Sequence, residues 1–532
     1  MVHKNHGFTL ISALLLGGCA TTGINRPVAE PVALKNVQAA YQRIEANDDQ
    51  GAKINAVIVT NKSRNMAEAA VADAAAASGV KARPLEGVPI LIKDNIETAD
   101  MPTTAGSLAL KDNRTGRDAP LVAKLRDAGA IIMGKTNLSE WANIRSTKST
   151  SGWSAVGGLT RNPHSKEGEM RNSCGSSSGS GAAVGAGFVD AAIGTETDGS
   201  IVCPAGVNGI VGMKPTVGLV SRTNIVPISA SQDTAGPMTG DVMMAARILA
   251  AISGTDPFDP ATAEADVRKR DYPALLTADT AGLTGMRIGV VRASQGDNPE
   301  IISLFDAALA RMKMAGAILV DINELGVDEQ KLGELEFALL LRELKRDMAG
   351  YLESLPDDSP IKHRTLADLI AFNQAHAQEE MAHFDQDIFV MAETDALLCP
   401  AKSAKKPTCD PQAEYRRVAA AAKAMAGSDG IDRLLEEYKV VLLVQPTNGP
   451  AWLSTLGKGD NFSPPSSSQL PAVAGYPHLT VPMGATKDGL PIGLSFIGPK
   501  WADALVLKAG YAFERAGPPL KVAPVAITGA KP

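Results

Sequence analysis

Three short segments restrict what this chain can fold into more than any other feature. Cys174–Gly181 (CGSSSGSG) and Gly194–Ala205 (GTETDGSIVCPA) are rich in glycine and serine, and Gly87–Lys93 is an apolar run that ends in a lysine. Glycine lets the backbone turn tightly and come close to a bound molecule. The small residues of Val184–Phe188, behind the first segment, predict a helix that packs tightly against a sheet. The pattern predicts a strand that ends at Lys93 and glycine-rich loops beside packed helices.

The rest of the chain alternates helix and strand signals. Leu121–Ala128 predicts a helix that stops at Gly129, and Ile131–Met133 predicts a buried strand after it. Residues 255 to 275 are polar and are expected to be a loop. Residues 334 to 427 predict mostly amphipathic helix and a possible cap over a substrate, because insertions around a scaffold often carry specificity. This alternation is typical of an α/β fold.

The serines and the lysine point to acyl transfer. A serine hydroxyl can attack a carbonyl or relay a proton, but at neutral pH it is a weak nucleophile and needs a base. Neither segment contains a histidine, and serine–lysine versions of the catalytic triad exist. Burial lowers the pKa of a lysine, so that its neutral form is populated. We therefore expect Lys93 to act as the base.

The three segments resemble the amidase signature family, whose members are serine hydrolases with a Ser–cisSer–Lys triad. The likeness continues through Val211–Val220 (VGMKPTVGLV) and Ser231–Met238 (SQDTAGPM). Weaker similarity to the family extends from about residue 35 to about residue 515. Lys135–Asn143 and Ala371–His376 look most similar to the bacterial peptide amidase branch. The resemblance implies a single large α/β/α domain over residues 35–520, with a mixed central sheet covered by helices.

The resemblance also implies roles for individual residues. Lys93 would be the base, Ser176 the relay and Ser200 the nucleophile, with no metal and no organic cofactor. The backbone N–H groups near Ser200 would form the oxyanion hole, which places Thr197, Asp198 and Gly199 there. Residues expected to support the site by bracing its loops are Ser177, Asp233 and Thr234.

Three positions depart from the commonest form of the motif. Asp198 stands where a glycine usually precedes Gly–Ser, Val202 where an arginine often follows, and Ser178 where the first loop usually has a glycine. Because an oxyanion hole uses backbone N–H groups, the side chain at residue 198 can change if the backbone conformation survives. Peptide-amidase-like relatives share the aspartate. The missing arginine argues against a substrate that carries a carboxylate.

Other chemistries fit these segments less well. A phosphate-binding loop would need Gly-Lys-Ser/Thr after its glycines, and none follows Gly181. The seven histidines form no His-Glu-x-x-His pattern and no paired spacing with cysteine, which argues against a metal hydrolase. A net charge of −6 without a basic block argues against nucleic acid as a partner. A hydrophobic content of 45% across 532 residues is enough for a large globular core.

The N-terminus predicts export. A basic start is followed by the apolar run Phe8–Leu16 and then by Gly17-Gly18-Cys19-Ala20. Leu16–Cys19 looks like a bacterial lipobox, so we expect residues 1–19 to be a signal, Cys19 to be lipidated and residues 20–34 to be a tether. The protein would then be periplasmic and bound to a membrane only through its lipid. Ordinary signal cleavage after Ala20 is the alternative.

Four further cysteines have no evident partner in the sequence, and an exported chain could pair them in three ways. They are Cys174, Cys203, Cys399 and Cys409. Four cysteines in so long a chain are too few for a disulfide framework to be required for folding. We expect Cys174 and Cys203, which flank the two serine loops, to be reduced.

The expected function is hydrolysis of a carboxamide C–N bond through an acyl-enzyme on Ser200. The favoured substrate is the C-terminal amide of a peptide, as the peptide amidase resemblance suggests, and a broad amidase acting on small alkyl or aryl amides is the alternative. The export signal and the lack of a basic face argue against an amidotransferase that works on charged tRNA. A non-catalytic lipoprotein scaffold that kept the fold is the alternative from another class.

Overall fold

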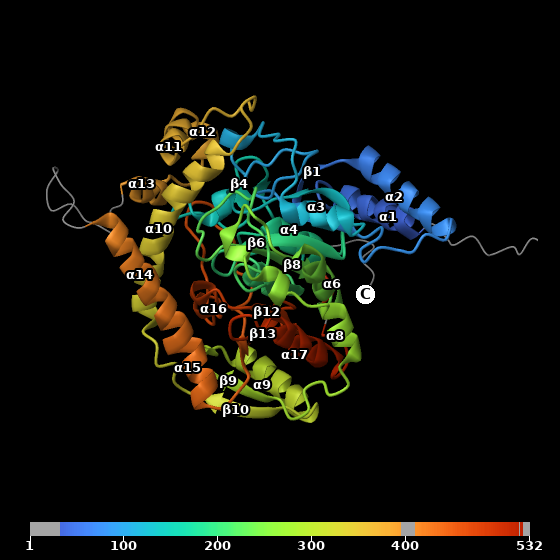
Figure 1. Ribbon diagram of the computed structural model, residues 1–532, viewed down its shortest axis with the longest axis vertical. Helices are drawn as coiled ribbons and strands as arrows, with labels where there is room; N and C mark the ends of the chain where they lie inside the picture. Colours follow the sequence, from blue (N-terminus) through green and yellow to red (C-terminus); the bar gives the residue numbers. More distant parts are fainter. Residues whose placement is uncertain (1–31, 395–409, 521, 525–532) are drawn as a thin grey trace, which may run out of the picture.

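A mixed sheet of 11 strands forms the centre of the molecule in a computed structural model that describes residues 32–394, 410–520 and 522–524 (Figure 1). Cys19, Cys399 and Cys409 lie outside these ranges. The strand order is β1-β3-β2-β6-β8-β7-β12-β13-β11-β9-β10. The strands of the sheet have these bounds: β1 (Val57–Thr60), β2 (Pro89–Lys93), β3 (Ile131–Thr136), β6 (Ala191–Glu196), β7 (Val211–Lys214), β8 (Thr234–Thr239), β9 (Arg287–Val291), β10 (Ile318–Ile322), β11 (Leu442–Pro446), β12 (His478–Ala485) and β13 (Pro491–Ile497).

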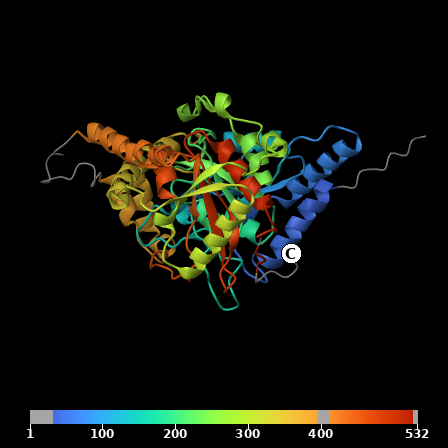
Figure 2. The same cartoon turned by 90° about the horizontal axis from the view of Figure 1, so that it is seen from below.

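Helices cover the sheet on both faces, as the resemblance led us to expect. The longer helices are α1 (Val32–Asn47), α2 (Lys62–Ala77), α3 (Pro120–Asp127), α4 (Ser178–Gly185), α5 (Val202–Val207), α6 (Val242–Ile252), α8 (Tyr272–Ala278), α9 (Pro299–Met314), α10 (Glu329–Glu353), α11 (Leu366–Ala375), α13 (Asp387–Glu393), α14 (Pro411–Ala426), α15 (Arg433–Glu437), α16 (Gln469–Ala474) and α17 (Asp503–Arg515). Figure 2 shows α1 and α2 on the opposite side of the molecule from α14. No helix in the part of the chain that the structure describes is long and apolar enough to cross a membrane.

Strand β2 shows how the sequence produces this sandwich. All five of its residues are buried, and successive side chains of a strand point to opposite faces of the sheet. Ile90 and Ile92 therefore pack into one core with α3, α6, α9 and α17, whereas Leu91 packs into the other core with α1, α2 and α4. A strand buried on both faces needs an unbroken apolar run, which is what the sequence provides before Lys93.

The expected elements are largely present. The helix and strand expected around Leu121 and Ile131 are α3 and β3, and the described part of residues 334–427 is mostly helical. The expectation of a loop over residues 255 to 275 was wrong in its second half, where α7 (Ala265–Arg268) lies and α8 begins at Tyr272. The side chain of Asp271 accepts a hydrogen bond from the backbone N–H of Ala274, and this N-cap starts a helix in a polar segment.

Parallel pairing fixes the position of the site. β2 pairs in parallel with both β3 and β6, so the carboxyl ends of these three strands meet at one edge of the sheet. Lys93 is the last residue of β2, and Glu196 is the last residue of β6. In open α/β sheets the crevice beyond such carboxyl ends is where ligands bind.

Candidate active site

Lys93 lies inside the protein with its amine against hydroxyl groups. Its side chain is fully buried, and Nζ lies 2.7 Å from Ser176 Oγ, 2.8 Å from Thr195 Oγ1 and 3.3 Å from the carbonyl oxygen of Thr195. Burial lowers the pKa of this lysine to about 7, although the negative charges of Asp233 and Glu196 act in the opposite direction. A large fraction of the amine is therefore neutral at physiological pH.

Ser176 reaches Lys93 from a loop that is packed without spare room. The Gly175–Ser176 peptide bond is cis, and Ser176 is fully buried with its carbonyl oxygen accepting a hydrogen bond from the N–H of Ser139, 3.0 Å away. The next turn begins α4, where a Cβ on Gly179 would lie 2.5 Å from the carbonyl oxygen of Asn137. Glycine is therefore required at residue 179 for the loop to approach β3.

Ser177 forms three hydrogen bonds that join the same loop to its neighbours. Its Oγ donates to the carbonyl oxygen of Thr195 at 3.1 Å and accepts from the N–H of Thr195 at 3.2 Å. Its own N–H donates to the carbonyl oxygen of Ser200, also at 3.2 Å. Ser177 thus links the loop of Ser176 to β6 and to Ser200.

Ser200 lies in a tight turn between β6 and α5. Gly199 has a φ of +76°, which a residue with a side chain rarely adopts. The carboxylate of Glu196 accepts hydrogen bonds from the N–H groups of Ile201 and Val202, at 2.7 and 3.0 Å. These bonds hold the chain on the far side of Ser200.

The backbone N–H groups within this turn are free to bind a ligand. In the described residues no acceptor is paired with the N–H groups of Thr197, Asp198, Gly199 or Ser200. Ser200 itself is 9% exposed. Unpaired backbone N–H groups next to a serine hydroxyl are the kind of donor that stabilises an oxyanion.

Asp233 supports the turn from the other side. Its carboxylate accepts hydrogen bonds from Thr197 Oγ1 at 2.6 Å and from the N–H groups of Ile228 and Ser229, both at 2.8 Å. Burial raises the pKa of Asp233 to about 6. Thr234, in contrast, places its hydroxyl only near the neighbouring carbonyl of Ala235, at 3.4 Å, so the structure gives it no contact with Lys93 or the serines.

A cavity of about 790 Å³ opens beside these groups. Thr195, Thr197 and Asp233 form part of its wall, so it reaches the partners of Lys93 and the start of the turn. Its three arginines are each paired with a carboxylate: Arg117 with Glu97, Arg222 with Asp259 and Arg346 with Asp347, all at 2.6 Å. The described wall of the cavity therefore offers no unpaired guanidinium to a ligand.

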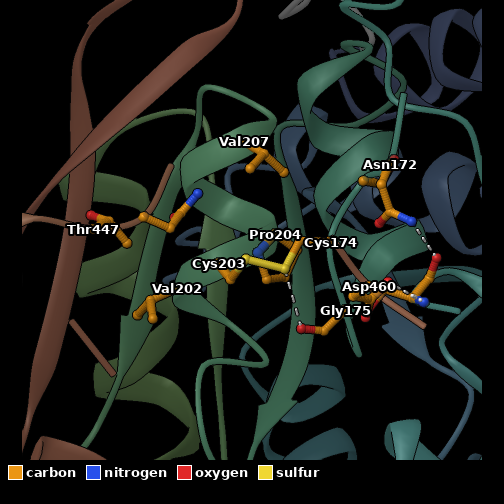
Figure 3. The surroundings of a disulfide bond; sticks show 12 residues. Asn172, Cys174, Gly175, Val202, Cys203, Pro204, Val207, Thr447 and Asp460 are labelled. Atoms are coloured by element: carbon orange, nitrogen blue, oxygen red, sulfur yellow. Dashed lines mark hydrogen bonds between the residues drawn. A yellow bond between two sulfur atoms is a disulfide. The ribbon is translucent and has the colours of Figure 1, made fainter. Parts of the chain in front are cut away.

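The expectation that Cys174 and Cys203 are reduced was wrong, because a disulfide bond joins them (Figure 3). Cys174 lies two residues before Ser176, and Cys203 lies three residues after Ser200. The serine loops meet through the Ser177–Ser200 contact, and this brings the flanking cysteines within bonding distance. The two cysteines pack against Val207, Ala451 and Trp452.

The sequence analysis missed several residues of the site. Thr195 and Glu196 belong to the serine-rich segment itself, but their types alone do not reveal that they contact Lys93 and the turn. Gln232 Nε2 lies 3.3 Å from the carbonyl oxygen of Thr197 and 2.8 Å from Glu336 Oε1. Glu336 comes from α10, and no local pattern in the sequence connects it with the site.

Comparison with known proteins identifies relatives over most of the chain. The family model described as Amidase matches residues 35–507. A probable amidase of Arabidopsis thaliana is 36% identical over 491 residues, which covers 91% of this chain and 87% of the relative. The crystal structure of native peptide amidase from Stenotrophomonas maltophilia superposes with a TM-score of 0.82 at 44% identity, covering 93% of this chain and 96% of the other. A peptide amidase solved in complex with the competitive inhibitor chymostatin gives a TM-score of 0.84 at 45% identity, covering 92% and 95%.

Proposed function

The chain belongs to the amidase family, and on that premise we propose that its substrate is the C-terminal carboxamide of a peptide. It is a hydrolase that acts on carboxamide C–N bonds. One observation carries the assignment of the reacting groups. The buried Lys93 amine, with a pKa of about 7, touches Ser176 beside a turn whose backbone N–H groups are free.

In the proposed mechanism Lys93 begins as a neutral amine. A neutral amine has two N–H donors and one lone pair, and Lys93 has three oxygen neighbours. The carbonyl oxygen of Thr195 can only accept a hydrogen bond, and Thr195 Oγ1 takes the second N–H. The lone pair is then left for the hydroxyl proton of Ser176.

Ser200 is the nucleophile. Lys93 takes the proton of Ser176, and Ser176 takes the proton of Ser200 as the Ser200 oxygen bonds to the amide carbon. The free N–H groups of the turn stabilise the negative oxygen that forms. Ser176 then returns a proton to the leaving nitrogen, the C–N bond breaks, and ammonia departs. Water hydrolyses the acyl-enzyme by the same proton path in reverse.

The cavity supports a neutral peptide as the acyl group. A volume of about 790 Å³ is in the range of pockets that enclose molecules of drug or short-peptide size. Because its arginines are already paired, the cavity provides no free cation for a carboxylate on the substrate. Val202, which stands where an arginine often follows the nucleophile, removes another cation from this position.

The test compares ammonia release from matched substrates. We expect a higher kcat/KM for an amidated di- or tripeptide than for a small alkyl or aryl amide, and no reaction with the same peptide as a free acid. Chymostatin should compete with the peptide amide, by analogy with the peptide amidase that binds it. Ser200→Ala protein is the matched control for contaminating activity. A higher kcat/KM on small amides would replace the peptide assignment with that of a broad amidase.

We also propose that the protein is exported and lipidated at Cys19. The support is the sequence: an apolar run of signal length followed by Leu16–Cys19. Cys19→Ser should release active enzyme into the soluble periplasmic fraction with an unchanged rate on small amides. A soluble wild-type protein whose mature N-terminus is Thr21 would show ordinary cleavage after Ala20 instead.

A further inference from the structure

Glu336 is a buried carboxyl group that the proposed mechanism does not use. It lies on α10, is 5% exposed, and has an amide donor on each oxygen. Gln232 Nε2 is 2.8 Å from its Oε1, and Gln469 Nε2 is 3.1 Å from its Oε2. Gln232 also donates to the carbonyl oxygen of Thr197. Glu336 is therefore connected, through one side chain, to the turn that carries Ser200.

Asp198 in that turn faces Glu336. Each of the two carboxyl groups changes the pKa of the other, and Ser468 also acts on Asp198. The hydroxyl of Ser468 lies against Gly199, the next residue of the turn. Asp198 Oδ1 is buried, and no amide or hydroxyl group in the described chain donates to it. Two ionised carboxylates cannot form a hydrogen bond with each other, because both are only acceptors.

We propose that Glu336 and Asp198 share a single proton, and that this pair is the positioning device of the turn that carries the nucleophile. The inference deepens the proposed function and rests on its assignment of Ser200. Glu336 holds the proton and donates to Asp198, while its own oxygens accept from Gln232 and Gln469. A glycine at residue 198, the commoner residue in the family motif, would need no such partner. The carboxyl group of Asp198 thus requires a proton donor at this place, and Glu336 provides it.

The protonation state follows from burial and from the two like charges. Burial and the charge of Asp198 raise the pKa of Glu336 to about 8, and burial raises the pKa of Asp198. The charged groups that face the pair from other elements are Lys214 on β7, which attracts Asp198, and Glu196 on β6, which repels it. The pKa of Lys214 is lowered to about 8 by burial, so its charge is lost over the same range. When the shared proton leaves, two carboxylates repel each other beside the free N–H groups.

Glu336→Gln tests the pair, because glutamine keeps a neutral donor and an acceptor at the same place at every pH. The probe is the rate at which a fluorophosphonate labels Ser200 from pH 6 to 10. At pH values above the pKa at which the pair loses its shared proton, we expect the labelling rate of the wild type to fall about tenfold for each pH unit. This slope is the one expected for the loss of one essential proton. Glu336→Gln should keep a rate within about threefold of the wild-type maximum and lose this alkaline fall.

Glu343→Gln is the matched control. Glu343 lies two turns further along α10 and is equally buried, but its carboxylate accepts from the hydroxyls of Ser229 and Ser231 rather than facing Asp198. We expect the alkaline fall to remain in this variant. Comparison of the two variants separates the titration of the pair from that of Lys214, which both retain.

Two readouts do not depend on catalysis. Infrared difference spectra should show a protonated carboxyl band at neutral pH that Glu336→Gln removes. Because the folded protein binds this proton more tightly than the unfolded chain does, wild-type stability should decrease as the pH rises from about 4.5 to about 8, and the variant should lack that contribution.

An unchanged alkaline limb together with an unchanged carboxyl band in Glu336→Gln would overturn the proposal. If fluorophosphonate does not label Ser200 but the protonated carboxyl band is present, the proposed function is wrong and the proposal of a shared proton still holds.

Discussion

Replacing Lys93 tests whether burial of this amine creates the catalytic base. Burial lowers the pKa from 10.5 to about 7. Since each pKa unit corresponds to 1.36 kcal/mol, holding the ammonium in this site costs on the order of 5 kcal/mol. At pH 7 an exposed lysine is neutral in roughly one molecule in 3,000, whereas Lys93 is neutral in about half. The structure thus increases the concentration of the base by about three orders of magnitude.

The assay is the pH dependence of kcat/KM on a peptide amide. The wild-type profile should rise with a midpoint near pH 7, set by Lys93 and the groups coupled to it. Lys93→Ala should lower kcat/KM by about five orders of magnitude, nearly as much as removal of the nucleophile does in serine hydrolases. Lys93→Arg should not rescue it, because a guanidinium stays protonated. Asp233→Asn should move the midpoint to lower pH, because the negative charge of Asp233 raises the pKa of Lys93.

Stability gives an independent check of the same shift. The unfolded chain binds a proton on Lys93 up to pH 10.5, and the folded chain releases it near pH 7. The free energy of unfolding should therefore rise with pH across this window, and Lys93→Met, which has no titrating group, should lack that rise. An ascending limb that stays near pH 7 in Lys93→Met would show that another group is the base.

The remaining predictions concern the groups around Lys93. Ser200→Ala should lower kcat by about five to six orders of magnitude, and mass spectrometry of fluorophosphonate-treated wild-type protein should find the label on Ser200, whereas a label on Ser176 or Ser177 would reverse the roles of the serines. Thr195→Val removes one of the oxygens that orient the Lys93 amine, so kcat should fall by about ten- to a hundredfold with little change in KM; a change confined to KM would contradict that role. Cys174→Ser with Cys203→Ser removes the disulfide between the serine loops and should destabilise the protein by about 3 kcal/mol, measured by denaturant unfolding beside a reduced wild-type sample; equal stability of the double variant and the oxidised wild type would contradict it.

The sequence was sufficient for the fold class, the family and the grouping of Lys93 with the serine loops. These depend on local features: an apolar run with a lysine at its end, and glycines where the backbone must turn. In the structure Lys93 contacts Ser176, and Ser177 and Asp233 form hydrogen bonds to the segment that carries Ser200. The catalytic roles of Lys93, Ser176 and Ser200 remain predictions, as does lipidation at Cys19.

Contacts between distant segments could not be predicted in the same way. The state of Cys174 and Cys203 depends on how closely two loops approach, and cysteine spacing alone does not give that distance. Glu336 reaches the site because a long helix passes the turn, and a glutamate on an amphipathic helix is usually solvated. The supporting role expected for Thr234 remains a prediction: Thr234 pairs with Glu196 between β8 and β6, and its hydroxyl lies near the carbonyl of Ala235.

The choice of lysine as the base also explains where the site lies in the fold. A histidine titrates near neutral pH in an exposed loop, but a lysine needs a dry environment to lose its proton. The end of β2 provides one, because the strand is buried on both faces by helices and on both edges by β3 and β6. Hydroxyl and carbonyl oxygens complete the surroundings of the amine, and none of these oxygens carries a negative charge that would hold the proton. The apolar run before Lys93 is therefore part of the catalytic apparatus, since it supplies the burial that makes this amine a base.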